Sequence, residues 1–153
     1  MKVLVFHIGP DRYALRLRAI ARVLPAAALK QIPLAPAYVA GLLELHGAPV
    51  PVIDLARLAG VAAAQMWFDS RIILVDYPDA AGALHALGLL AEHVIGIDSV
   101  DEALLADSGV AGAAFLGPVA SAAGGLLQLV ELADLIAPEL RALLFQAAPG
   151  VAP

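Results

Sequence analysis

The chain has 153 residues, of which 61% are hydrophobic and 15% are charged, and it contains no cysteine. This composition excludes a mainly disordered protein, because the apolar side chains can offset the entropy lost on folding. The absence of cysteine excludes a disulfide framework and a thiolate metal site, and it fits a reducing cytosol. The net charge of −5 argues against a nucleic-acid partner. At this length we expect one domain, with room for two lobes.

The longest stretch without a charged residue, residues 108–130, has 23 residues and is long enough to span a bilayer. It contains five glycines and a proline, and neither end carries the Lys or Arg that orients a membrane helix. Two short apolar strands joined by glycine turns explain this stretch better. The apolar run at the N-terminus is too short for a signal peptide. We therefore expect a soluble protein without direct membrane insertion.

Short apolar runs that end at turn residues predict strands in the first part of the chain. Residues 3–8 form such a run. Residues 13–18 alternate with period two, and a phase shift near residue 19 predicts a bulged strand that continues to residue 24. A hairpin is then predicted from residues 42–45 and 49–55.

The turn of that hairpin is expected at His46 and Gly47. Asp54 follows as a plausible N-cap for a short helix over residues 55–58, because a side-chain carboxylate can accept hydrogen bonds from the free N–H groups of a first turn.

The second half of the chain continues with strands and ends in a helical segment. Residues 71–77 predict a clear strand, and residues 84–97 predict one long strand or two short ones. Residues 115–120 and 126–130 flank a glycine-rich turn as a hairpin, and residues 131–148 predict helix that is broken by a proline. Nine or ten short strands with little helix between them favour an all-β barrel or sandwich.

Charge is distributed unevenly along the chain. Residues 1–71 hold eight basic and four acidic side chains, a balance of +4, whereas residues 72–153 hold one basic and ten acidic side chains, a balance of −9. One interpretation is a solvated strand face. The other is a pair of docking surfaces of opposite sign, which would favour head-to-tail contacts or two different partners.

Groups that carry catalysis are scarce. The four serines stand outside any G-x-S-x-G elbow, and the chain has no H-E-x-x-H, Walker A or G-x-G-x-x-G motif. Asp98, Asp101 and Glu102 form an acidic group that we interpret as a solvated turn. The histidines have unrelated spacings, although folding could bring some of them together with carboxylates at a metal site: His7, His46, His85 and His93. We expect no catalysis, no metal and no cofactor.

The order and spacing of several short motifs resemble the CheW-like family. The resemblance is sharpest at Pro-Val-Ile-Asp-Leu, residues 51–55, and it covers roughly residues 3–137. The other motifs are VFHIG at 5–9, YAL at 13–15, VLP at 23–25, IP at 32–33, APAYVAGLL at 35–43, RIILV at 71–75, LGLL at 87–90, VIGI at 94–97 and LLQLVEL at 126–132.

This resemblance implies a single CheW-like domain over residues 1–153. The fold would be two intertwined five-stranded SH3-like β-barrels with short connecting helices, a shared hydrophobic seam and a C-terminal helix. The first strand would pair into the second barrel. Lobe one would hold about residues 10–65, lobe two about residues 1–9 plus 70–137, and residues 138–153 would form the C-terminal helix and tail.

Membership of this family also implies a non-catalytic cytoplasmic scaffold at membrane receptor arrays. It would couple the cytoplasmic hairpin tip of a chemoreceptor to the regulatory domain of a CheA-type histidine kinase. Such a scaffold needs two exposed apolar patches on a rigid frame. We expect a groove near residues 39–52 to take the receptor helix and the second lobe, near residues 84–100, to engage the kinase.

Candidate contact residues follow from that expectation. The partner-binding candidates are Val39, Leu43, Leu45, His46, Val50, Val52, Trp67, Leu89 and Ile97. Gly41, Gly47 and Pro51 are interpreted as backbone devices, and Asp54 as the helix cap. Trp67, with its neighbours Met66 and Phe68, either plugs a barrel end or forms an aromatic anchor on the surface.

The chain departs from the family pattern at three positions. Glu44 and His46 stand where the family usually has Asn and Arg, and Arg22 stands where an acidic residue is common. The Leu-Lys-x-Ile-Pro run at residues 29–33 resembles the variant adaptors of Wsp-type surface-sensing pathways. Two other functions stay open, namely an array component or competitor that has lost receptor binding, and a barrel that binds a small ligand.

Overall fold

The computed structural model describes residues 1–61, 68–109, 112–122 and 124–145. Three 3-10 turns and two short helices accompany the strands: Leu17–Ala19, Glu102–Leu104, Leu132–Asp134, α1 (Leu55–Leu58) and α2 (Pro138–Leu144). The strands are β1 (Lys2–Ile8), β2 (Asp11–Arg16), β3 (Ile20–Pro25), β4 (Val39–Leu45), β5 (Ala48–Asp54), β6 (Arg71–Pro78), β7 (Leu84–Ser99), β8 (Leu116–Ala122) and β9 (Gly125–Val130).

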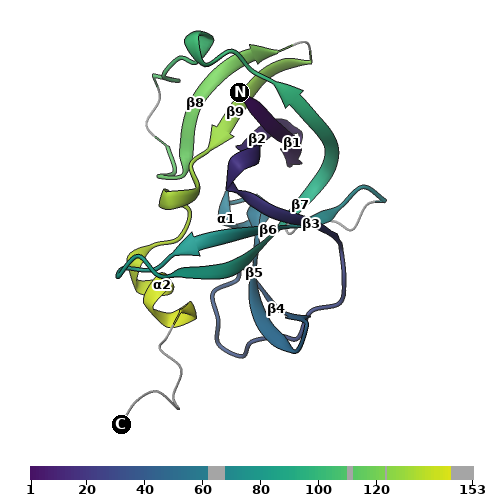
Figure 1. Cartoon of the computed structure of the whole chain (residues 1–153), viewed down its shortest axis with the longest axis vertical. Coiled ribbons are helices and arrows are strands. Elements are labelled where there is room, and N and C mark those ends of the chain that lie inside the picture. The colour runs from purple at the N-terminus through teal and green to yellow at the C-terminus, as the bar shows by residue number, and fades with distance from the viewer. Residues whose placement is uncertain (62–67, 110–111, 123, 146–153) are drawn as a thin grey trace.

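One long strand, β7, belongs to two sets of strands. Its first half pairs with β6 and in parallel with β5, and its second half pairs with β1. One five-stranded barrel therefore has the order β3-β6-β7-β5-β4, and the other has the order β7-β1-β2-β9-β8. Figure 1 shows β7 curving from the lower barrel into the upper one. The all-β prediction of two intertwined five-stranded barrels is confirmed.

The bend of β7 explains how one strand serves both barrels. His93 has a positive φ of 46°, and the pairing of β1 with β7 shifts register between Val5 and His7. A bulge of this kind bends a strand and increases its twist. The expected strand over residues 84–97 is therefore a single strand of 16 residues.

The largest hydrophobic core lies between the barrels and not inside either one. On β1, Leu4 and Phe6 belong to this shared core, while Val3 and Val5 belong to the core of the upper barrel. On β6, Tyr77 and its same-face neighbours also enter the shared core, while the opposite face fills the lower barrel. Both faces of these strands are buried, which is why their sequences are apolar without alternation.

The strand pairing divides the chain differently from the predicted lobes. β2 pairs with β1 and β9 in the upper barrel, and β6 pairs with β3 in the lower barrel. Apolar patterns identify strands but not their partners. The expected limits at residues 10 and 70 therefore put β2 with the lower barrel and β6 with the upper one, and both placements are wrong. The bulged strand expected over residues 13–24 is also wrong, because the 3-10 turn Leu17–Ala19 separates β2 from β3.

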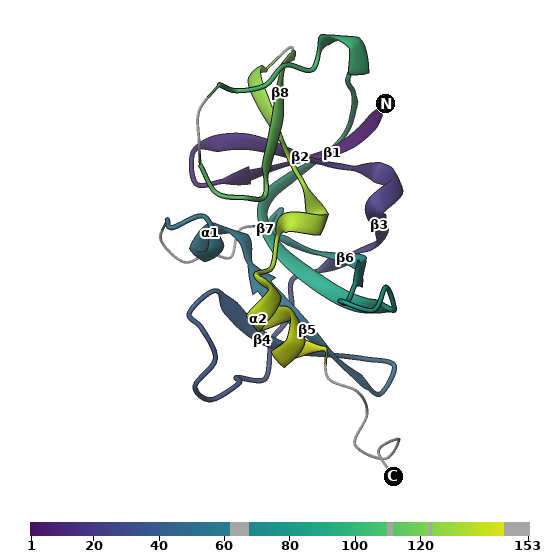
Figure 2. The ribbon, with the colours of Figure 1, turned by 90° about the vertical axis from the view of Figure 1, so that its left-hand side faces the viewer.

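The first strand and the last described helix lie in different barrels. Figure 2 shows the N-terminal strands in the upper barrel and α2 beside β4 and β5 in the lower one. The expected C-terminal helix is present as α2, and residues 146–153 lie outside the described part of the chain. Within the described residues no helix is long and apolar enough to cross a membrane.

Candidate functional site

An apolar groove crosses the lower barrel. It has a volume of about 510 Å³ and lies between the loop 32–36, the β4–β5 hairpin and α2. Outside the loop, its lining residues are Val39, Leu42, Pro49, Pro51, Leu140, Leu143 and Leu144. Every residue in this lining is apolar, so shape and desolvation determine what it can bind.

The β4–β5 hairpin that forms one wall of the groove depends on two glycines. His46 and Gly47 both have positive φ, 51° and 81°, as a two-residue type I′ turn requires. At Gly41, φ is 147° and an added Cβ would stand 2.5 Å from the backbone oxygen of Lys30. That close approach lets Lys30 and Leu42 exchange two backbone hydrogen bonds, of 2.9 and 2.8 Å, which tie the incoming loop to β4.

The opposite wall, α2, is held by aromatic and polar contacts. The hydroxyl of buried Tyr77 donates to the carbonyl oxygen of Ala133 at 3.1 Å and accepts from the N–H of Ile136 at 3.2 Å. Beyond the end of α2, the ring of Phe145 stacks on His85 with a centroid distance of 4.7 Å. These contacts fix the position of α2 against β6 and β7.

His85 also contacts a carboxylate. Its Nε2 lies 2.7 Å from Asp79 Oδ2, and Asp79 caps the β6–β7 turn by accepting from the N–H groups of Ala81 and Ala83. The hydrogen bond from His85, assisted by those backbone N–H groups, lowers the pKa of Asp79 below its ordinary value. Asp79, His85 and Phe145 therefore form one connected group beside the groove.

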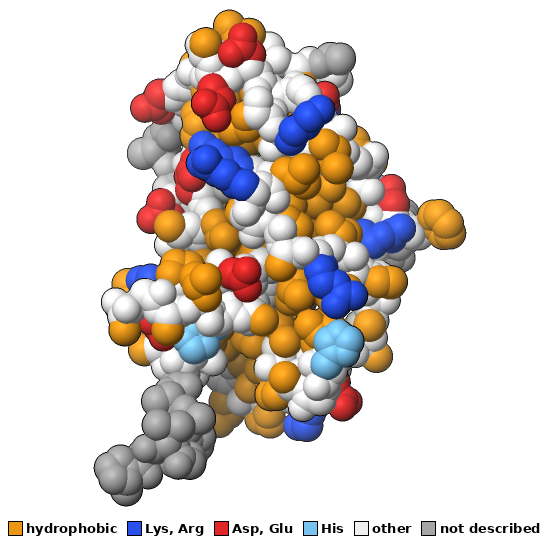
Figure 3. All heavy atoms as spheres, viewed as in Figure 1, with side chains coloured by type: hydrophobic (Ala, Val, Ile, Leu, Met, Phe, Trp, Pro, Cys, Tyr) orange, Lys and Arg blue, Asp and Glu red, His pale blue; other side chains and the backbone are white. Residues whose placement is uncertain are grey.

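A second apolar surface lies on the upper half of β7. Ile95 and Ile97 are 58% and 60% exposed, although they belong to a strand whose other half is buried. Ile97 lies directly opposite Leu4 of β1, and Ser99 lies opposite Lys2, so these side chains share one face of the sheet. Figure 3 shows an apolar patch over this region with Lys and Arg side chains around it. We call the surface formed by Ile95 and Ile97, with Lys2 at its edge, the β7 surface.

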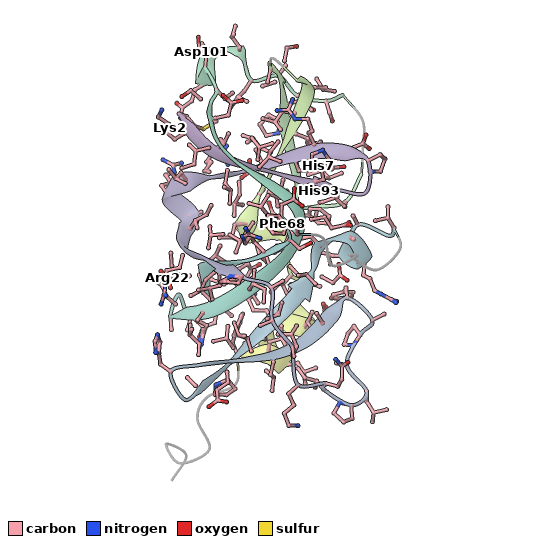
Figure 4. The ribbon with its side chains drawn as sticks, turned by 90° about the vertical axis from the view of Figure 1, so that its right-hand side faces the viewer. Lys2, His7, Arg22, Phe68, His93 and Asp101 are labelled. Carbon is pink, nitrogen blue, oxygen red and sulfur yellow. The ribbon has the colours of Figure 1, made fainter. Side chains whose placement is uncertain are left out.

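The histidines do not gather into a metal site. The rings of His7 and His93 meet edge to face, with centroids 5.4 Å apart. Figure 4 shows the two side chains next to each other. His93 Nδ1 lies 2.9 Å from Asp69 Oδ1. Among the residues that the structure describes, no three His, Asp or Glu side chains are grouped to hold a metal ion.

The comparisons with known proteins agree on the family. The family model for the CheW-like domain matches residues 2–139. The chain belongs to the CheW-like family. The chemotaxis protein CheW of Rhizobium meliloti (strain 1021) is 26% identical over 101 residues, which are 66% of this chain and 62% of that protein.

A solved structure shares the fold over most of the chain. The crystal structure of scaffolding protein TtCheW from Thermoanaerobacter tengcongensis matches with a TM-score of 0.79 and 26% identity. The match covers 89% of this chain and 87% of that one. The family resemblance and the fold predicted from the sequence motifs are therefore confirmed.

Several of the residues expected to contact partners are buried in this CheW-like fold. Val52 and Leu89 are 0% exposed, and Val50 is 4% exposed. Val52 belongs to the core of the lower barrel and Leu89 to the shared core, because both faces of β5 and β7 are covered there. These three side chains present almost no area to a partner, which corrects the expectation that they contact one.

The other expected residues are divided between distant places. Val39 lines the apolar groove, while Leu43 and Leu45 are half-buried on β4 and His46 is exposed at the hairpin turn. Ile97 lies on the β7 surface of the other barrel. Trp67 and Met66 lie outside the described residues, whereas Phe68 is fully exposed.

The sequence alone did not indicate that the loop 32–36 and α2 form walls of a groove. Pro33 and Pro36 shape one side of the groove, although no local pattern marks a proline loop as the wall of a binding site. Leu140, Leu143 and Leu144 are spaced by three and four residues, which is the pattern of one helix face. That spacing was a usable signal for a docking helix. Ile95 alternates with Ile97 and could have been found by the same period-two argument.

Proposed function

We propose that this CheW-like chain is a non-catalytic scaffold that couples the cytoplasmic hairpin tip of a chemoreceptor to the regulatory domain of a CheA-type histidine kinase. The observation that carries the proposal is the pair of separate apolar surfaces, one on each barrel. Exposed apolar surface of this kind marks protein interaction sites. The relatives are a chemotaxis protein and a scaffolding protein, which supports the same class of function.

The apolar groove suits the receptor. A helix can lay one apolar face into a groove, with side chains at positions i, i+3, i+4 and i+7 as anchors. The groove is lined by aliphatic side chains and prolines and lies between the β4–β5 hairpin and α2. We therefore assign the helical receptor tip to it, in an array at the cytoplasmic side of the membrane.

The β7 surface suits the kinase. Ile95 and Ile97 stand on the half of β7 that pairs with β1, so they lie side by side on one face of a strand pair. The centre of a protein–protein interface is apolar and depleted in charged residues, and Ile95 and Ile97 provide such a centre. The regulatory domain of the kinase is the folded partner that coupling requires.

The shared core supports the scaffold role. β7 belongs to both barrels, and the largest core fills the space between them. The two surfaces are therefore held at a fixed separation and orientation. A rigid connection of this kind can place a receptor and a kinase beside each other without any chemistry of its own.

The proposal is tested by isothermal titration with three variants of matched chemistry. Leu143→Asp alters the groove, Ile97→Asp alters the β7 surface, and Leu126→Asp is the control on β9; these leucine and isoleucine side chains are 58%, 60% and 65% exposed. We expect the wild type to bind both partners in the micromolar range, about −8 kcal/mol. Leu143→Asp should weaken binding of the receptor tip at least tenfold, and Ile97→Asp should weaken binding of the kinase domain at least tenfold.

Other patterns would contradict the proposal in different ways. A wild-type protein that binds neither partner would exclude coupling. If Leu143→Asp weakened kinase binding and Ile97→Asp weakened receptor binding, the scaffold function would stand and the assignment of the two surfaces would be reversed. Kinase binding without receptor binding, together with a self-associated species in light scattering, would favour the alternative of a competitor within the array.

A further inference from the structure

A positively charged hollow lies at one end of the β7 surface. It has a volume of about 520 Å³ and is lined by Met1, Lys2, Arg16, Leu17, Arg18 and Glu102. Counting the terminal ammonium, the lining carries four cationic groups and one carboxylate. This balance is opposite to the net charge of −5 of the whole chain.

Two of these cationic groups are already engaged within the chain. The Nη1 of Arg16 donates to both carboxylate oxygens of Glu131 at 3.0 Å. The ammonium of Met1 donates to the carbonyl oxygen of Val100 at 2.9 Å. Lys2 and Arg18 are exposed, and neither forms an ion pair with any residue in the described parts of the chain.

The hollow is continuous with the β7 surface. Lys2 lies opposite Ser99, two residues beyond Ile97 along the same face, so its side chain borders the apolar patch. Arg18 shares the hollow with Lys2. In Figure 4, Lys2 and Arg22 point to the same side of the molecule, at different heights along this face. Lys2 and Arg18 therefore lie together at one end of the apolar patch.

We infer that the partner of the β7 surface is an acidic protein segment, with carboxylates placed beside the apolar side chains that cover Ile95 and Ile97. The inference rests on the proposed function, because it specifies the chemistry of the partner at that site. Lys2 and Arg18 provide the charge complementarity. Complementary charge at the border of an interface steers association and selects the partner, while the apolar centre supplies most of the affinity.

The test uses the full chain and whichever partner, kinase regulatory domain or receptor tip, loses binding to Ile97→Asp. Arg18→Glu and Lys2→Glu reverse the border charges, and Arg57→Glu is the control with the same charge change at an exposed position on α1. We expect each border variant to weaken binding about tenfold and the control less than twofold. Raising NaCl from about 50 to about 500 mM should weaken the wild type several-fold and Arg18→Glu much less.

The outcomes separate the inference from the proposed function. If Ile97→Asp weakens binding but the border variants and the control behave alike, with equal salt dependence, the acidic partner is excluded and the scaffold stands. If Arg18→Glu or Lys2→Glu strengthens binding, the partner is basic and the inference is overturned. If Ile97→Asp weakens neither partner, the β7 surface itself is not a docking site and both statements about it fail.

Discussion

The groove and the β7 surface obtain their apolar character in different ways. The groove is assembled from three separate segments, the loop 32–36, the β4–β5 hairpin and α2, and its described lining residues are all apolar. The β7 surface consists of adjacent strand positions bordered by Lys2 and Arg18. The first depends on tertiary contacts that hold its walls apart, whereas the second is built into the pairing of β1 with β7.

Because of this difference, some changes should affect one surface and leave the other intact. A substitution that loosens α2 or the β4–β5 hairpin alters the groove and leaves β7 in place. Salt and charge reversal alter recognition at the β7 surface and leave the uncharged groove unaffected. The β7 surface therefore serves as an internal reference for changes made on the groove side.

Gly41→Ala should have the largest effect. The added Cβ would stand 2.5 Å from the backbone oxygen of Lys30, and φ is 147°, so both sterics and backbone conformation oppose it. We expect a loss of about 3 kcal/mol in the free energy of unfolding, measured by urea denaturation. Gly47→Ala is the control, because open space surrounds that Cβ position and only its positive φ is unfavourable, at about 1 kcal/mol. Equal losses would show that the approach to Lys30 is unimportant.

Much of the fold was predictable because local patterns agree with it. The apolar runs of β1, β6 and β7 end at Gly, Pro and Asp residues, and these boundaries are visible in the sequence. Asp54 accepts hydrogen bonds from Ala56 and Arg57, as a cap at the start of α1 should. The order of family motifs then supplied the two-barrel arrangement, which strand patterns alone left open between barrel and sandwich.

The parts that failed depend on contacts between distant segments. No local pattern states that β2 pairs with β9, or that Leu140 would face a proline loop more than 100 residues earlier. Burial failed for a related reason. Val52 and Leu89 look like half-exposed strand residues, but both faces of their strands are covered, one by the barrel interior and one by the shared core.

Tyr77→Phe should destabilise the wall of the groove next most strongly. Its hydroxyl accepts a hydrogen bond from the Ile136 N–H and donates one to the Ala133 carbonyl, and Tyr77 is fully buried. Removing the hydroxyl leaves a buried donor unsatisfied, at about 1–2 kcal/mol. Hydrogen exchange should become faster at Ile136 and across α2, while the amides of β1 and the upper half of β7 keep their protection.

Faster exchange throughout the molecule after Tyr77→Phe would contradict this localisation. It would mean that α2 unfolds only together with the two barrels. The groove and the β7 surface would then share one cooperative unit, and the contrast between them would be one of charge alone.

His46→Asn should have a smaller and favourable effect. His46 adopts φ of 51° in a type I′ turn, a conformation that Asn tolerates better than His. We expect a gain of about 0.5 kcal/mol in the free energy of unfolding and no change in kinase binding. A loss of stability in His46→Asn would show that the imidazole contributes more than the turn conformation.

His46→Arg introduces the residue that is usual in the family. It should leave the free energy of unfolding unchanged, so any change in receptor affinity would identify this exposed turn as part of the interface.

Asp79→Asn should give the smallest effect, because Asp79 and His85 are both partly open to solvent and screened. The pKa of Asp79 is lowered from 3.8, chiefly by the hydrogen bond from His85, so the carboxylate form favours the folded state. The stability that the wild type gains over Asp79→Asn is therefore present above pH 3.8 and is lost as the pH falls through the lowered pKa of the folded protein. Urea midpoints of both proteins, measured from about pH 6 downward, should converge in acid. In a His85→Gln background, adding Asp79→Asn should shift the urea midpoint less at every pH. If the difference between the wild type and Asp79→Asn grew in acid, Asp79 would not hold the contact between His85 and the end of α2.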